Sequence, residues 1–141
     1  VRRHIEVHPD RAGHFRLAFD STTAPARLVA GWANLRAGAL ALPYGDQGLV
    51  VRAALYRSLG GHPPLPLMED VALVRRLGRR RLALMDATAT TSAARYEAEG
   101  WLARGARNLS TLALWRLGVP AERLARRYEA GGGIARKGLR G

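Results

Sequence analysis

Two linked segments decide the fold of this chain, LPYGDQGLVV at residues 42–51 and PLMEDVALV at residues 66–74. The first starts as a loop, because a proline and a glycine-bracketed polar pair interrupt regular structure, and it ends in an apolar run short enough for a buried strand. The second places an acidic pair, Glu69 and Asp70, at the start of an apolar helical stripe. A loop, a buried strand and an acidic helix start in this order indicate an α/β fold.

The segment before this pair shows the same alternation of strand and helix. Apolar residues recur at every second position from Phe15 to Phe19, which predicts a half-buried strand. The next apolar residues follow at helical spacing and predict an amphipathic helix over about 25–39, with the stripe Leu28, Trp32, Leu35 and Ala39.

The rest of the chain divides into short elements and two tails. Residues 53–59 favour a helix that ends at a double glycine, and residues 82–85 and 87–91 favour strand. Residues 100–130 predict a helical hairpin, since Gly118 ends one helix and Pro120 begins the next. We expect residues 1–12 to be a tail or a displaced segment, and residues 131–141 to be a flexible basic tail.

Length and composition indicate one globular domain of 141 residues with a net charge of +12. The charge does not by itself indicate a nucleic-acid partner, because 22 of the 23 basic residues are arginine in an Ala- and Gly-rich chain, as codon bias in a GC-rich genome produces. The absence of cysteine excludes disulfides and thiolate metal sites. Without an apolar run of spanning length or a leader-like start, we expect a cytoplasmic protein, with the inner face of the membrane as the other location.

The acidic pair is the first candidate for chemistry. A sugar transfer that inverts configuration needs a carboxylate within hydrogen-bond reach of the attacking hydroxyl, and Glu69 and Asp70 would hold one rigidly at the rim of a sheet. The structural alternative is that both acids complement the helix macrodipole, which is worth roughly 0.3–1 kcal/mol.

Two further segments carry candidate binding residues. In the first, glycines bracket the polar pair, so the backbone can approach a ligand closely while Asp46 and Gln47 face it; the alternative is a tight turn. In the second, Arg95 and Tyr96 follow the last predicted strand, where they could clamp a diphosphate and stack on a sugar or base. The alternative there is a solvated arginine beside a core tyrosine.

Taken together, these segments resemble the acceptor-side half of family 2 glycosyltransferases, in particular the bacterial subgroup of radical-SAM and selenodomain-associated transferases. The resemblance spans residues 13–128 and rests on five motifs in the family's order: FRLAFD (15–20), LPYGDQG (42–48), PLMEDV (66–71), TSAAR (91–95) and RLGV (116–119). Where processive relatives carry Gln-x-x-Arg-Trp, this chain has SAARY at 92–96, so a processive polymer synthase is not expected.

The resemblance implies a partial GT-A type fold, with residues 13–99 as the acceptor-side half: a mixed sheet flanked by helices, followed by the helical hairpin. It implies an enzyme that transfers a sugar, with inversion, from a nucleotide-sugar donor to an acceptor. By the same resemblance Asp70 is the catalytic base and Glu69 its neighbour. The substrate-binding residues would be Tyr44, Gly45, Asp46, Gln47, Arg95 and Tyr96.

One family feature is missing from the sequence. Family members bind a divalent metal, Mg²⁺ or Mn²⁺, through an Asp-x-Asp motif in the nucleotide-binding half, and these 141 residues contain no Asp-x-Asp. We therefore expect the chain to be a truncated transferase that is inactive alone. If the strand at 14–20 lacks its neighbours, its apolar edges would also favour self-association.

Two functions of another class remain open. The Trp101/Trp115 helix, with Arg104, Arg107 and Arg116, could dock weakly on an anionic membrane surface, although the same stripe packs equally well on a sheet. Nucleic-acid binding has only the net charge in its favour.

Overall fold

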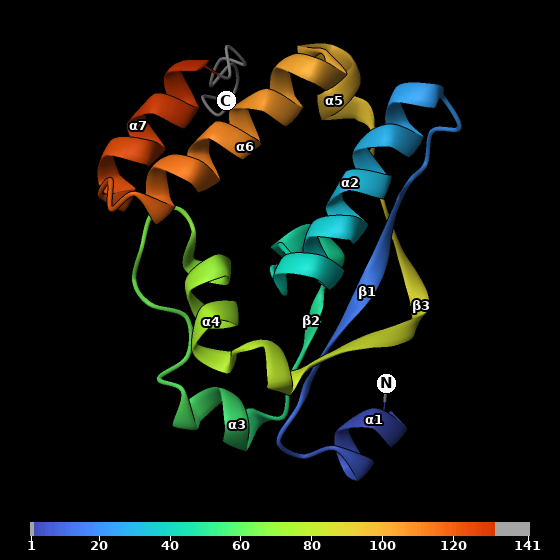
Figure 1. Cartoon of the computed structure of the whole chain (residues 1–141), viewed down its shortest axis with the longest axis vertical. Coiled ribbons are helices and arrows are strands. Elements are labelled where there is room, and N and C mark those ends of the chain that lie inside the picture. The colour runs from blue at the N-terminus through green and yellow to red at the C-terminus, as the bar shows by residue number, and fades with distance from the viewer. Residues whose placement is uncertain (1, 132–141) are drawn as a thin grey trace, which may run out of the picture.

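In the computed structural model, which describes residues 2–131, a mixed three-stranded sheet is flanked by helices (Figure 1). β1 (Ala12–Phe19) is the central strand, parallel to β3 (Leu82–Thr91) and antiparallel to β2 (Leu49–Val50). The predicted α/β class is therefore confirmed. The expectation that the strand at 14–20 lacks neighbours is wrong, because β1 lies between two strands and β3 has the long outer edge.

The helices agree with the sequence pattern at most positions. The two predicted strands at 82–85 and 87–91 form one strand, and a short helix, α5, follows it. A first helix, α1, lies within the predicted N-terminal tail, whereas residues 132–141 of the C-terminal tail lie outside the described residues. The helices are α1 (Arg2–Val7), α2 (Ala24–Leu40), α3 (Ala53–Ser58), α4 (Glu69–Leu77), α5 (Ala94–Glu99), α6 (Trp101–Arg116) and α7 (Ala121–Gly131).

Helix α2 packs on β1 with its small apolar residues and leaves most of its large apolar ones in solvent. Its buried face is formed by alanines such as Ala33 and Ala37, whereas Leu28, Trp32 and Leu35 are 67%, 47% and 59% exposed. The predicted apolar stripe thus lies on the open side of the helix. Alanine on the packed face lets the helix backbone come close enough to the strand for a polar side chain to bridge them.

That bridge is Asn34, which bonds the backbone of β1 twice. Its Oδ1 accepts the Leu17 N–H at 2.8 Å and its Nδ2 donates to the Leu17 carbonyl at 3.1 Å. Gln47 donates its Nε2 to the same Asn34 oxygen at 3.3 Å and to the Phe15 carbonyl at 3.4 Å. Since β2 pairs with β1 only at Gly13 and His14, two side-chain amides take the place of a strand beyond that point.

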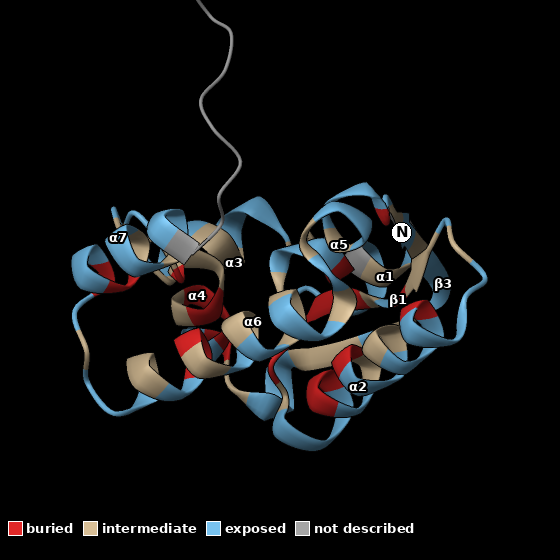
Figure 2. Ribbon diagram, turned by 90° about the horizontal axis from the view of Figure 1, so that it is seen from above, coloured by how far each residue is buried: buried red, intermediate tan, exposed pale blue. Residues whose placement is uncertain are grey.

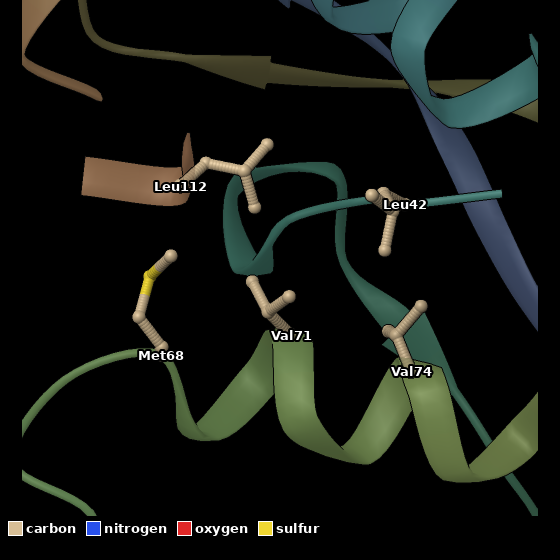
Figure 3. Close-up of a cluster of buried hydrophobic side chains, with 5 residues drawn as sticks. All are labelled: Leu42, Met68, Val71, Val74 and Leu112. Atoms are coloured by element: carbon tan, nitrogen blue, oxygen red, sulfur yellow. The ribbon is translucent and has the colours of Figure 1, made fainter. Parts of the chain in front are cut away.

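The main apolar cluster joins α4 to α6 and to the loop after α2. Figure 3 shows its five buried residues, with Val71 and Val74 pointing up from α4 toward the others: Leu42, Met68, Val71, Val74 and Leu112. Figure 2 shows that buried positions gather on α4 and on the inner side of α2. No helix among residues 2–131 is long and apolar enough to cross a membrane.

We predict that Asn34→Leu lowers the free energy of unfolding by about 2–4 kcal/mol, because it leaves the Leu17 N–H and carbonyl inside the protein without partners. Urea denaturation followed by circular dichroism measures the loss. The matched control is Leu35→Asn on the exposed side of α2, which should change stability by no more than about 0.5 kcal/mol. Equal effects of the two substitutions would contradict this role for Asn34.

Candidate functional site

The first wall of the site is a single 3₁₀ turn, Gly45–Gln47, which follows Pro43 and Tyr44. Gln47 anchors this turn from within: it is 0% exposed, and its Oε1 accepts the Tyr44 N–H at 3.3 Å and an Arg36 N–H at 3.4 Å. Arg36 also lies under the Tyr44 ring, with its Cζ 3.4 Å from the ring centroid. The turn is thus fixed to α2 and β1 by polar contacts.

The second wall is the start of α4, which Asp70 ties to that turn. The Asp70 Oδ2 accepts the Gly45 N–H at 2.7 Å, and its Oδ1 accepts the Val71 N–H at 2.7 Å. A side chain at position 45 would place its Cβ 3.2 Å from the Asp70 carboxylate, so glycine permits this approach. Each carboxylate oxygen accepts one backbone N–H and keeps a lone pair for a further donor.

The residue before this acidic pair has an unusual backbone. Met68 adopts φ 68° and ψ 16°, the left-handed region that non-glycine residues rarely occupy, while its side chain is buried in the main apolar cluster. Such a conformation persists only where surrounding contacts fix it, and it commonly marks functional sites. Here it sets the direction in which α4 presents Glu69 and Asp70.

The third wall follows the end of β3. Asp20 fixes it, because its Oδ1 accepts the Ala93 N–H at 2.7 Å and its own N–H donates to the Thr91 carbonyl at 3.1 Å. The first turn of α5 then carries Tyr96 into an aromatic cluster, edge-on to Phe19 and stacked on Trp101 with ring centroids 5.0 and 4.9 Å away.

Helices α6 and α7 supply the last wall. Glu99 at the end of α5 accepts from Arg104 at 2.8 Å and pairs with Arg107, which fixes the angle between α5 and α6. Arg104, Asn108 and Thr111 recur at intervals of four and three on α6, so they share the face of the helix that lines the site.

These walls enclose one cleft of about 560 Å³, a size that suits a small-molecule ligand. Its lining combines acidic, basic, aromatic and apolar side chains from segments far apart in the sequence. The lining residues are Phe19, Tyr44, Gly45, Asp46, Leu67, Met68, Glu69, Asp70, Val71, Thr91, Ser92, Ala94, Arg95, Tyr96, Arg104, Asn108, Thr111 and Tyr128.

The structure brings together seven of the eight site residues that the sequence predicts. Tyr44, Gly45, Asp46, Glu69, Asp70, Arg95 and Tyr96 all line the cleft. Gln47 does not: it is buried behind the turn, where its amide serves the network with Asn34 and Arg36. Sequence reasoning missed the part of the wall that comes from α6 and α7. The polar residues of this wall recur at intervals of four and three along 104–111, and this spacing in the sequence could have predicted a shared helix face.

The acids of the cleft differ in their surroundings. Although Asp46 is an exposed residue, partial desolvation of its carboxyl group raises its pKa above that of a free aspartate. Arg36 opposes this shift, and nearby Asp70 adds to it. Burial also raises the pKa of Tyr44 to about 12. Burial is likewise the main cause of a raised pKa at Tyr96, and the charge of Asp46 contributes. The cleft therefore holds Asp46 with weakened preference for its ionised form.

The two tryptophans considered for membrane docking are half-buried and packed within the domain. Trp101 lies edge-on to Phe19 and stacks on Tyr96, and Trp115 packs against the main apolar cluster with Arg75 over its ring. This arrangement favours the packing interpretation of that helix over an interfacial one.

Residues 2–131 contain no cluster of three or more His, Cys, Asp or Glu side chains that could hold a metal ion. Comparison with known proteins gives no match to a family model, to a curated protein or to a solved structure.

The raised pKa of Asp46 predicts a pH dependence of stability. The unfolded chain releases this proton near the ordinary value of 3.8 and the folded protein releases it at higher pH, so this group lowers the free energy of unfolding as pH rises through that interval. Asp46→Asn removes the effect, so its stability relative to the unsubstituted protein should rise as pH increases from below 3.8 through the raised pKa of Asp46.

Thermal unfolding of both proteins across that range measures the difference. Asp86→Asn, which removes the same carboxyl group from an exposed position of β3, is the matched control. A stability difference at Asp46 that does not change with pH would contradict the assigned surroundings of this carboxyl group.

Proposed function

We propose that this chain forms the acceptor-binding side of a glycosyltransferase of the family 2 type, with a sheet of the GT-A kind. The observation that carries the proposal is the convergence of three segments on one cleft: the turn at 44–46, the acidic pair at 69–70 and the Arg-Tyr pair at 95–96. Each was selected from the sequence for sugar-transfer chemistry, and they are separated by some two dozen residues along the chain.

The proposed reaction inverts the configuration at the sugar. The acceptor oxygen attacks the anomeric carbon while its proton passes to a carboxylate, and the bond from that carbon to the diphosphate oxygen breaks with its electron pair leaving on the diphosphate. Asp70 is the proposed base, held at 2.7 Å from the Gly45 N–H, and Glu69 stands beside it at the same helix start. Arg95 also lines the cleft and offers positive charge for a phosphate group, whereas the charge of Arg104 is paired with Glu99.

Acceptor binding is the part of this proposal that the chain can carry out alone, and Asp46 should contribute to it. Hydrogen bonds to charged groups are worth about 1.5–3 kcal/mol, so Asp46→Asn should weaken binding of a monosaccharide by roughly 10–100-fold. Methyl glycosides of glucose, galactose and mannose are suitable probes. Trp101 stacks on the cleft residue Tyr96, so tryptophan fluorescence reports occupancy.

The substitution is informative because Asp46→Asn is expected to stabilise the fold at neutral pH, so lost binding cannot be attributed to unfolding. Asp86→Asn again serves as the control and should bind as the unsubstituted protein does. Failure of all three glycosides to bind, or equal binding by the Asp46 variant, would overturn the proposal.

We further predict that the chain alone gives no sugar transfer with a nucleotide-sugar donor and Mn²⁺ or Mg²⁺, because the sequence has no Asp-x-Asp to hold the metal on the leaving diphosphate. Release of nucleoside diphosphate, followed with each glycoside as acceptor, measures this. Turnover that Asp70→Asn abolishes would mean that the donor site lies within these residues after all.

A further inference from the structure

Three polar side chains on the helical wall of the cleft form a hydrogen-bonded chain that the proposed reaction does not use. Asn108 on α6 stands in the middle, donating its Nδ2 to the Tyr96 hydroxyl at 3.2 Å and accepting from the Tyr128 hydroxyl at 2.9 Å through its Oδ1. Tyr96 comes from α5 and Tyr128 from α7, so three helices meet in this triad, and all three residues line the cleft.

The two tyrosine hydroxyl groups of this triad differ in what they can offer a ligand, since one can still donate a hydrogen bond and the other can only accept one. The hydroxyl that accepts from the Asn108 amide keeps its own hydrogen for donation, and the hydroxyl that donates to the amide keeps only lone pairs for accepting. If the Asn108 amide is rotated by 180°, the two hydroxyl groups exchange roles, but one still donates and the other still accepts. The wall therefore presents one donor and one acceptor, joined through the Asn108 amide.

The rings that carry these hydroxyls are held in place by their surroundings. Tyr96 stacks on Trp101 at 4.9 Å between ring centroids, and Arg104 lies over its ring at 5.1 Å. Arg107 lies over the Tyr128 ring at 5.2 Å. Because the rings are fixed before any ligand arrives, the donor and acceptor lose little freedom on binding, which favours selective recognition.

We propose that Tyr96, Asn108 and Tyr128 select the acceptor by binding two neighbouring hydroxyl groups of a saccharide ring. One ligand hydroxyl accepts from the free tyrosine O–H, and its neighbour donates to the other tyrosine oxygen. A saccharide also has apolar C–H faces that suit the aromatic side chains of the same cleft. This inference rests on the proposed function, since it names the acceptor chemistry of the same cleft.

The test compares Tyr128→Phe with the unsubstituted chain, using the methyl glycoside that binds best and each of its monodeoxy analogues. A neutral hydrogen bond corresponds to about a 3–10-fold change in affinity. In the unsubstituted protein, we expect the two analogues that each lack one contacted hydroxyl to bind weaker by this factor. Tyr128→Phe should bind the parent glycoside weaker by a similar factor and should no longer distinguish it from the analogue that lacks the hydroxyl bound by Tyr128.

This loss of discrimination separates recognition from a merely structural role, which would weaken both ligands and keep their ratio. Tyr56→Phe is the matched control, because the Tyr56 hydroxyl bonds His62 and does not line the cleft, so it should keep full discrimination.

The experiments distinguish a wrong role for the triad from a wrong function for the cleft. Glycoside binding that is weakened by Asp46→Asn, together with unchanged discrimination in Tyr128→Phe, would overturn the triad alone. Absence of any glycoside binding would overturn both the triad and the proposed function.

Discussion

The side-chain amides of Asn34 and Gln47 form the interaction on which the rest of this structure depends. They supply backbone partners to β1 where β2 has already ended, and they do so only because α2 approaches the strand with alanines. The same Gln47 carries the turn that leads to Asp46, so the closure of the sheet and the shape of the cleft share one buried polar network. Fully satisfied networks of this kind specify a single arrangement, and partial loss is costly.

Asp70 shows how a residue can belong to the fold and to the site at once. Its carboxylate joins two segments that are 25 residues apart, which positions the acidic start of α4 against the turn at 45–47. The carboxylate is thereby oriented before a ligand binds, as a base that acts on a hydroxyl needs to be. Asp46 lies in the same cleft, where burial raises the pKa of its carboxyl group.

The sequence predicted elements well where local periodicity decides them and less well where packing does. The strand at 15–19, the helix of α2 and the acidic start of α4 follow from spacing alone. The side on which α2 packs did not follow, because Asn34 and the small alanines outweigh the larger apolar stripe. Gln47 looked like a ligand residue since only tertiary contacts reveal that its amide points inward. Tyr128 was missed for a related reason, because nothing in the local sequence of α7 indicates that its hydroxyl bonds Asn108 of α6.

Met68 limits the ways in which this site can change. Its position demands a left-handed backbone, which favours glycine or asparagine, and also a buried apolar side chain for the cluster with Val71 and Leu112. Glycine would relax the backbone but leave a void, whereas asparagine would suit the backbone but bring an amide into an apolar pocket. Substitutions that adapt the cleft to a new ligand are therefore expected to accumulate on the helical wall, while the segment before the acidic pair stays mutationally intolerant.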